Sequence, residues 1–257
     1  MLLPTQKVMP RTLVIAHRTD IGLQRKENQD ACGFWRDTVT GEHLLIVADG
    51  LGGAACGSAA SQMAVNVIRE QYFNPQWQQG AITERLSHAI IHANHEIHHQ
   101  SEANPSCKGM GTTCVIAAIS GKYAFLAHVG DSRIYLIRDQ KIARLTRDHS
   151  MVQRMLEDGL INEEEAETHP QKNVLQRAIG PRSDVVPEVR PEPMELFPGD
   201  VLILCTDGLS GQLLDEEIFE TVQCAVDPQA ACDALVEFAN RRGGPDNITV
   251  AVCKVTA

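Results

Sequence analysis

The sequence predicts an α+β fold in which clusters of strands alternate with clusters of helices. Apolar runs of strand length gather at residues 12–17, 43–50, 111–145 and 200–208. Between them, residues 58–73 and 82–100 carry apolar side chains at helical spacing. Strands in clusters with helices between the clusters favour a layered α+β fold over a regular alternation of strand and helix.

The individual elements differ in their patterns. Runs 43–50 (HLLIVADG) and 200–208 (DVLILCTDG) predict short buried strands, and each run ends in Asp-Gly. Between 111 and 145, several β-rich runs are separated by short polar turns such as SGK and RDQ, which predicts an antiparallel meander. A later helix begins at Asp227-Pro228, where Asp suits the N-cap and Pro the first turn.

Length and composition predict one domain that binds neither nucleic acid nor a membrane. The chain has 257 residues, of which 43% are hydrophobic, enough for a sizeable core. A net charge of -10 opposes broad binding to nucleic acid or an anionic membrane. No run of about 18 apolar residues predicts a membrane span, and residues 1–10 lack a signal-peptide core. We expect a single domain at 12–255 behind a short extension at 1–11.

The eight cysteines form no C-x-x-C pair, and several, such as Cys205 and Cys253, stand inside apolar runs. This pattern is typical of buried free thiols. Together with the missing signal peptide, it predicts a cytoplasmic, reducing location.

Five aspartates are candidates for a metal site. Asp-Gly and Asp-Asn pairs are ordinary in turns, so no single one indicates function. If strand ends converge, however, several carboxylates face one another and need a cation to stay ionised. Oxygen ligands select Mg²⁺, Mn²⁺ or Ca²⁺ over Zn²⁺, and such a site suits hydrolysis by a bridged water. The candidates are Asp30, Asp49, Asp131, Asp207 and Asp246.

Seven further motifs occur in a fixed order along the chain. They are GLQRKENQDA (22–31), VADGLGG (47–53), GMGTT (109–113), VGDSRIYLIR (129–138), LTRDHS (145–150), CTDGLS (205–210) and GPDNITVAV (244–252). Together they resemble the motifs of the metal-dependent protein phosphatase family, the 2C type, in its compact bacterial form, and the resemblance runs from about residue 12 to residue 255.

The resemblance implies a four-layer αββα sandwich, in which two antiparallel sheets are flanked by helices, with a binuclear metal centre at one end. It implies that Asp49 bridges two Mn²⁺ or Mg²⁺ ions. Asp207 and Asp246 would complete the coordination of one ion, and the Gly50 carbonyl would bind the other ion.

The remaining site residues are also assigned by the resemblance. Asp30 would act through bound water, and Asp131 with Asp207 would form a third, weaker metal site. Arg25 fits the phosphate-binding arginine, since its planar fork suits phosphate oxygens. The chain departs from relatives at Leu51, where animal members have a histidine, and at Gln29, where many have an acidic residue.

The implied reaction is hydrolysis of phosphoserine and phosphothreonine in proteins by in-line attack of a metal-bridging hydroxide, without a phosphoenzyme. The implied partners are phosphorylated Ser/Thr proteins and a cognate Ser/Thr kinase of bacterial signalling. We expect a monomer that binds neither nucleic acid nor membrane. Residues 150–180 resemble the flap beside the active site, although a plain solvated helix pair is the alternative.

Parts of the sequence are compatible with two other function classes. Residues 95–99 (HEIHH) match the H-E-x-x-H zinc-peptidase motif and lie in an expected helix, but a third ligand has no obvious candidate. Incidental zinc binding by these histidines and a solvated helix face stay open. A phosphatase-like binding module would be expected to lack at least one metal aspartate, and all are present.

Overall fold

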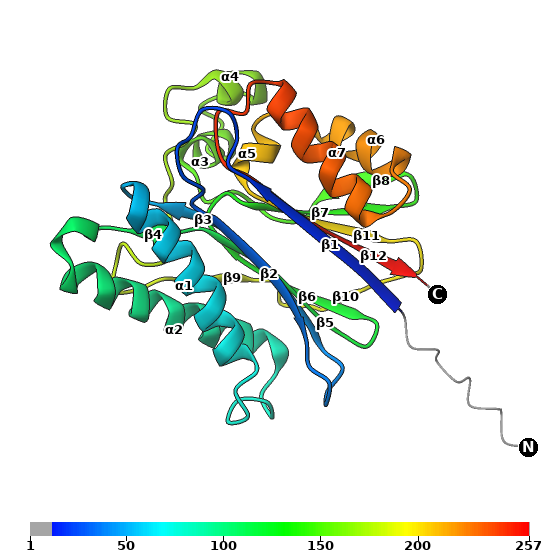
Figure 1. Cartoon of the computed structure of the whole chain (residues 1–257), viewed down its shortest axis with the longest axis horizontal. Helices are drawn as coiled ribbons and strands as arrows, with labels where there is room; N and C mark the ends of the chain where they lie inside the picture. Colours follow the sequence, from blue (N-terminus) through cyan, green and yellow to red (C-terminus); the bar gives the residue numbers. More distant parts are fainter. Residues whose placement is uncertain (1–11, 257) are drawn as a thin grey trace, which may run out of the picture.

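Two antiparallel sheets pack face to face in the computed structural model, which describes residues 12–256 (Figure 1). The predicted extension at 1–11 lies outside these residues. The first sheet has the strand order β1-β12-β11-β7-β8. Its strands are β1 (Thr12–Asp20), β12 (Ile248–Thr256), β11 (Val201–Cys205), β7 (Arg133–Arg138) and β8 (Lys141–Arg144).

The second sheet has the order β10-β6-β5-β3-β2, with β4 beside β3 and β9 beside β6. Its strands are β2 (Asp30–Arg36), β3 (His43–Leu51), β4 (Gly111–Thr112), β5 (Cys114–Ser120), β6 (Tyr123–Val129), β9 (Glu188–Val189) and β10 (Met194–Glu195).

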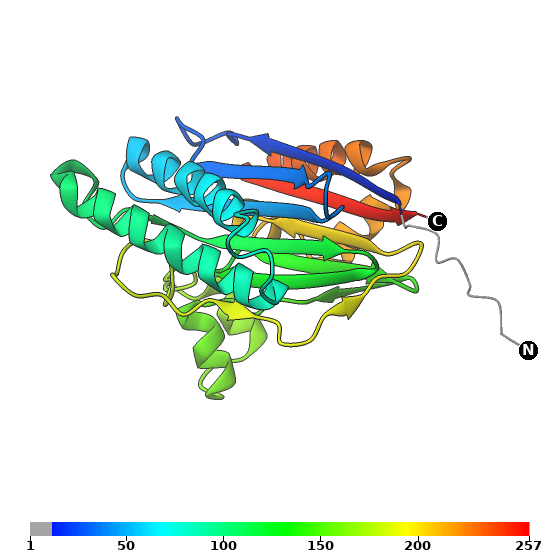
Figure 2. The same ribbon diagram turned by 90° about the horizontal axis from the view of Figure 1, so that it is seen from below.

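Helices cover the outer faces of both sheets. Helices α1 (Ala54–Tyr72) and α2 (Ile82–Ala103) lie on the second sheet, and α5 (Asp207–Ser210), α6 (Asp215–Cys224) and α7 (Pro228–Arg241) lie on the first (Figure 2). Asp227 caps α7 as predicted, because its Oδ1 accepts the Ala230 N–H at 2.8 Å. The four layers confirm the predicted αββα sandwich.

Strand β3 shows how one sequence run supports two cores. Leu44, Ile46 and Ala48 face α1 and α2, whereas Leu45 and Val47 point into the layer between the sheets. Alternate side chains of a strand leave opposite faces, so a strand buried on both sides reads as a continuous apolar run. The predicted buried strand at 43–50 is thereby confirmed.

The meander expected between 111 and 145 is divided between the two sheets. Strands β5 and β6 pair with each other in the second sheet, while β7 and β8 pair in the first. The chain crosses over at Gly130 and Asp131, where Gly130 has φ +105. Short polar turns predict which strands are adjacent in sequence but carry no signal for a change of sheet.

The prediction that all cysteines are free thiols is wrong. Cys56 in the first turn of α1 and Cys107 in the short 3₁₀ helix Pro105–Cys107 form a disulfide, with Cα atoms 5.4 Å apart. Cys224 is free but exposed. The two bonded cysteines are 51 residues apart, so only the packing of α1 on α2 brings them together. The disulfide removes one ground for expecting a reducing compartment.

The segment expected to be a flap lies between β8 and β9. It contains α3 (Met151–Glu157) and α4 (Glu163–Thr168), followed by irregular chain. Ser150 and Asn162 cap the two helices through their side-chain oxygens. None of the helices in residues 12–256 combines the length and apolar character needed to cross a membrane.

Candidate metal centre

The five candidate aspartates gather at one end of the sandwich. Asp30 begins β2 and Asp49 stands near the end of β3, and the two residues are direct partners across the β2–β3 pair. Asp207 follows β11 and Asp246 precedes β12. Asp131 lies in the turn between β6 and β7. Both sheets therefore contribute carboxylates to the same end.

Two glycines let the backbone close around this end. A Cβ on Gly50 would lie 2.1 Å from the Gly57 carbonyl oxygen and 2.6 Å from that of Gln29. A Cβ on Gly208 would lie 1.9 Å from the Asn247 carbonyl oxygen. Any side chain at either position would force backbone apart, so the glycine of each Asp-Gly pair is required by close packing.

The electrostatics of the cluster disfavour charge in the absence of a cation. Desolvation by burial, reinforced by the neighbouring carboxylates, raises the pKa of Asp49 well above its usual range. The same two causes raise the pKa of Asp131 to about 8. The pKa of Asp207 is also raised by burial and by Asp246. Asp49 interacts electrostatically with all four other aspartates, which places it centrally.

Asp30 is the most buried member of the cluster, at 7% exposure. Its Oδ2 accepts a hydrogen bond from the Thr206 hydroxyl at 3.0 Å. Burial is the main cause that raises its pKa to about 7. The threonine hydroxyl fixes the carboxyl group and leaves its other oxygen for the site.

The residues present fit divalent metal ions. Asp30 Oδ1 and Asp207 Oδ1 are buried without a hydrogen-bond partner, which is costly for a carboxyl oxygen unless a cation or its water fills the need. Every candidate side-chain ligand in the cluster is a carboxylate, which is the kind of ligand that Mn²⁺ and Mg²⁺ bind. In the described residues, no three of the aspartates bring oxygens within 4.8 Å of one another.

Arg25 lies beside the cluster, on the loop between β1 and β2. Its Nη2 forms an ion pair with Asp246 Oδ2 at 2.7 Å, and half of its side chain is exposed. An exposed guanidinium at the rim of a carboxylate cluster can reach an incoming anion. The assignment of Arg25 to phosphate binding stays a prediction, since its partner in this structure is the carboxylate of Asp246.

Supporting residues were missed by sequence reasoning. Asn247 Oδ1 accepts the Gln29 N–H at 2.8 Å, and its Nδ2 donates to the Ile21 and Glu27 carbonyls at 2.9 Å each. It thereby shapes the loop that carries Arg25 and Asp30. The Thr113 hydroxyl accepts the Asp49 N–H at 3.1 Å. The Asp-Asn pair at 246–247 was the available signal, but it reads equally well as an ordinary turn.

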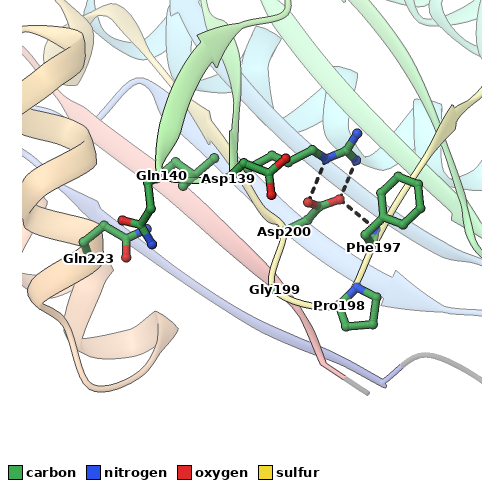
Figure 3. Close-up of a pocket in the computed structure, with 9 residues that line it drawn as sticks. Asp139, Gln140, Phe197, Pro198, Gly199, Asp200 and Gln223 are labelled. Carbon is green, nitrogen blue, oxygen red and sulfur yellow. Dashed lines mark hydrogen bonds and ion pairs between the residues drawn. The ribbon is translucent and has the colours of Figure 1, made fainter.

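The pocket drawn in Figure 3 lies at the opposite end of the molecule. Its lining includes Asp139 and Gln140 of the β7–β8 turn, and Phe197, Pro198 and Asp200 before β11. Arg138 there donates from Nε to Asp200 Oδ1 at 2.9 Å, so its charge is already compensated. Because β7 and β11 both run between this pocket and the aspartates, the pocket is separate from the candidate centre.

The H-E-x-x-H match gains no support. His95 and His99 are exposed on α2, which covers the outer face of the second sheet. In the described part of the chain, neither belongs to a set of three metal-ligating side chains. A zinc peptidase would need a third ligand close to both histidines.

Two sheets stacked between helices, with carboxylates converging at one end, define a layered α+β protein with a site suited to divalent metal ions. The family model for Protein phosphatase 2C matches residues 24–238. The chain is 38% identical over 235 residues to the protein phosphatase PhpP of Streptococcus pneumoniae, covering 91% of this chain and 94% of that one.

Solved structures agree. The Mycobacterium tuberculosis serine/threonine phosphatase PstP/Ppp superposes with a TM-score of 0.85 at 35% identity, over 95% of this chain and 99% of that one. A PstP catalytic domain in complex with two manganese ions gives a TM-score of 0.83 at 35% identity, with the same coverage. The chain belongs to the protein phosphatase 2C family.

Proposed function

We propose that this protein is a metal-dependent phosphatase that removes phosphate from phosphoserine and phosphothreonine in proteins. The convergence of five aspartates beside an exposed arginine carries the proposal, because it provides ligands for divalent cations next to a site for a phosphate group. Related chains of the same length and fold carry the names of serine/threonine phosphatases.

The aspartates and one carbonyl would hold the ions. Asp49, with Asp207 and Asp246 on one side and the Gly50 carbonyl on the other, would bind two Mn²⁺ or Mg²⁺ ions. Asp131 with Asp207 would bind a third more weakly. When bound, the ions supply an activated water and positive charge beside the phosphoryl group.

The chain's own side chains would orient the reactants. Arg25 would exchange its partner Asp246 for two phosphate oxygens, which aligns the phosphoryl group for in-line displacement. Asp30 Oδ1 lacks a partner and can accept a proton from the attacking water, because Thr206 holds only the other oxygen. Leu51 follows Gly50 and has no proton to donate, so water would protonate the leaving oxygen.

Substrate recognition and location follow from the same chemistry. The flap at 150–180 begins within the LTRDHS motif and would border the phosphoprotein. The kinase that makes the substrate would be a Ser/Thr kinase of the same signalling system. We further propose that the enzyme acts in the cytoplasm and as a monomer.

Phosphate release from matched phosphothreonine, phosphoserine and phosphotyrosine peptides tests the function. We expect turnover with Mn²⁺ or Mg²⁺, none with EDTA, and a preference for the first two peptides. Recovery after EDTA removal and Mn²⁺ addition is the control for unfolding. Undiminished turnover in EDTA, or a preference for phosphotyrosine, would contradict the proposal.

A further inference from the structure

Three ionisable side chains outside the aspartate cluster meet where the flap joins the second sheet. His128 on β6 and Glu188 on β9 are direct partners across the strand pair. The ring of His149, which precedes α3, stacks on that of His128 with centroids 4.6 Å apart. Within residues 12–256, these three form the one set whose ligand atoms all lie within 4.8 Å of one another. Their composition suits a metal ion.

The hydrogen bonds argue against a metal at this place. The Gly130 backbone N–H donates to His149 Nδ1 at 3.1 Å, so Nδ1 presents its lone pair. A neutral ring then carries its proton on Nε2, which lies 3.2 Å from Glu188 Oε2 and donates to it. Arg177 Nη1 lies 3.4 Å from the same nitrogen, but a guanidinium can only donate, so the shorter contact to Glu188 is the one that a protonated Nε2 makes. Neither nitrogen of His149 is left to bind a cation. His128 Nε2 is engaged as well, since it donates to the Arg147 carbonyl at 2.8 Å.

We propose instead that His149 is a positioning residue for Asp131. His149 bonds Gly130 twice, because its own backbone N–H also donates to the Gly130 carbonyl at 2.9 Å. Gly130 immediately precedes Asp131, so these two bonds orient the peptide that carries the carboxylate. The inference rests on the proposed role of Asp131 in binding the weaker metal ion.

The Gly130 turn is held from its other side as well. Gly130 has φ +105, and a Cβ there would lie 2.5 Å from Thr113 Cβ. Thr113 in turn hydrogen-bonds the Ser132 hydroxyl at 2.7 Å and the Asp49 N–H at 3.1 Å. Gly130, which precedes Asp131, is therefore held on one side by Thr113, which also bonds the Asp49 N–H, and on the other side by His149. We call the two His149–Gly130 hydrogen bonds the clamp.

Glu188 sets the orientation of the clamp. By accepting a hydrogen bond from Nε2–H, its carboxylate favours the tautomer whose Nδ1 can accept the Gly130 N–H. Burial lowers the pKa of His149 to about 4, and nearby His128 and Arg177 oppose protonation while Glu188 favours it. The ring therefore stays neutral near pH 7. A second proton would have to bind Nδ1, where it would point at the Gly130 N–H and break that hydrogen bond.

The clamp also joins the flap to the metal centre. The His149 carbonyl accepts the Gln176 N–H at 2.7 Å, and the Met151 N–H donates to the Val174 carbonyl at 2.8 Å. The start of the flap therefore pairs with its residues 174–176 beside His149. A movement of residues 149–151 or 174–176 would therefore displace Gly130 and, with it, the adjacent Asp131.

A matched pair of variants tests the clamp. In His149→Asn the side-chain oxygen lies near the position of Nδ1 and can still accept the Gly130 N–H. In His149→Gln the amide lies near Nε2, so contact with Glu188 can persist while the Nδ1 acceptor is lost. Mn²⁺ binding is measured by calorimetry and by the electron paramagnetic resonance of free Mn²⁺, with Asp131→Ala as the reference for loss of the weak ion.

We expect His149→Gln to lower the affinity for the weakly bound Mn²⁺ about tenfold or more, because residues that orient metal ligands have effects of this size. The affinity of His149→Asn for the same ion should stay within about threefold of wild type. Both variants should keep the two tight ions. Equal losses in the two variants, or an Asp131→Ala protein that keeps the weak ion, would overturn the proposal. Wild-type protein without Mn²⁺-dependent turnover would instead refute the proposed function.

The tautomer can be read in the wild-type protein, which removes any dependence on how the variants fold. A long-range ¹H–¹⁵N spectrum of histidine-labelled, metal-free protein should show His149 protonated on Nε2 and unprotonated on Nδ1. A proton on Nδ1 would exclude the clamp whatever the metal measurements show.

Discussion

At the scale of single residues, the metal centre depends on carboxylates whose neighbours are also carboxylates. Burial raises the pKa of Asp49, and repulsion by the four other aspartates adds to this effect. Removing one charge from such a centre therefore has two opposite effects. It relieves repulsion in the metal-free protein, but it also removes a ligand when the cations are bound.

Asp49→Asn separates these two effects. We expect kcat to fall at least about a thousandfold, because the central ligand is lost. The metal-free variant should nonetheless be as stable as wild type or more stable, since a neutral amide ends the repulsion. Steady-state kinetics at saturating Mn²⁺ and urea unfolding in EDTA measure the two quantities. The control is Asp139→Asn, the same change at the opposite end of the sandwich. A loss of activity below tenfold would place the site elsewhere.

Arg25 is the residue whose partner should change during the reaction. Arg25→Ala should lower kcat/KM about ten- to hundredfold, because a bidentate charged contact to phosphate is lost. Arg25→Lys should recover only part of this, since an ammonium lacks the planar fork. The control is Lys26→Ala, which removes the adjacent exposed charge. Kinetics that do not change in Arg25→Ala would refute its assignment.

At the scale of elements, the disulfide joins the start of α1 to the end of the α2 segment. These ends flank the VADGLGG and GMGTT motifs, whose strands β3 and β4 pair with each other. The bond therefore stabilises chain next to the metal centre without contributing a ligand.

Removing the disulfide should cost stability more than activity. Closing a loop of about 50 residues is worth roughly 4 kcal/mol in the chain-entropy model, so Cys56→Ser with Cys107→Ser should lower the free energy of unfolding by up to that amount. Urea unfolding of the variant measures it, with Cys224→Ser as the control at an exposed free thiol. In denatured, unreduced protein six thiols should react, and eight after reduction. Eight before reduction would show that the bond is absent.

Local patterns predicted elements well, whereas long-range pairings were harder to predict. The buried strands, α1, α2 and the cap at Asp227 follow from apolar spacing and turn chemistry, which are local. Three of the candidate aspartates, Asp49, Asp207 and Asp246, could be proposed because each stands beside a strand-like run. The crossing at Gly130, the Cys56–Cys107 bond and the supporting Asn247 depend on residues far apart in sequence, and no local pattern encodes them. His149 belongs to a predicted motif, but its role emerges only from its bond to Gly130.

At the scale of the whole molecule, two sheets bring negative charge to one end and hold it there. Residues from β2, β3, β11 and β12 cannot move apart without disrupting the core between the sheets. The stability of the fold and the occupancy of the metal centre are therefore linked, and pH acts on both.

The metal-free protein should lose stability as pH rises from about 4 to 8. Burial and neighbouring carboxylates raise the pKa of Asp30 to about 7 and of Asp131 to about 8, whereas an unfolded aspartate titrates near 3.8. In this window the folded state binds more protons than the unfolded state, so the free energy of unfolding falls with increasing pH. Cations need the ionised carboxylates, so Mn²⁺ binding should release protons and stabilise the protein more at pH 8 than at pH 5.5.

Thermal unfolding with EDTA or saturating Mn²⁺, from pH 5.5 to 8, measures this stabilisation. Calorimetry at pH 7 in buffers of different ionisation enthalpy counts the protons released. Asp131→Asn is the matched test, because it removes one carboxyl whose pKa is raised: its proton release should be smaller than that of wild type, and its metal-free stability should fall less with pH. A stabilisation by Mn²⁺ that does not change with pH, or an uptake of protons on binding, would mean that the carboxylates are already ionised in the metal-free fold. The repulsion argued for Asp30 and Asp131 would then be wrong.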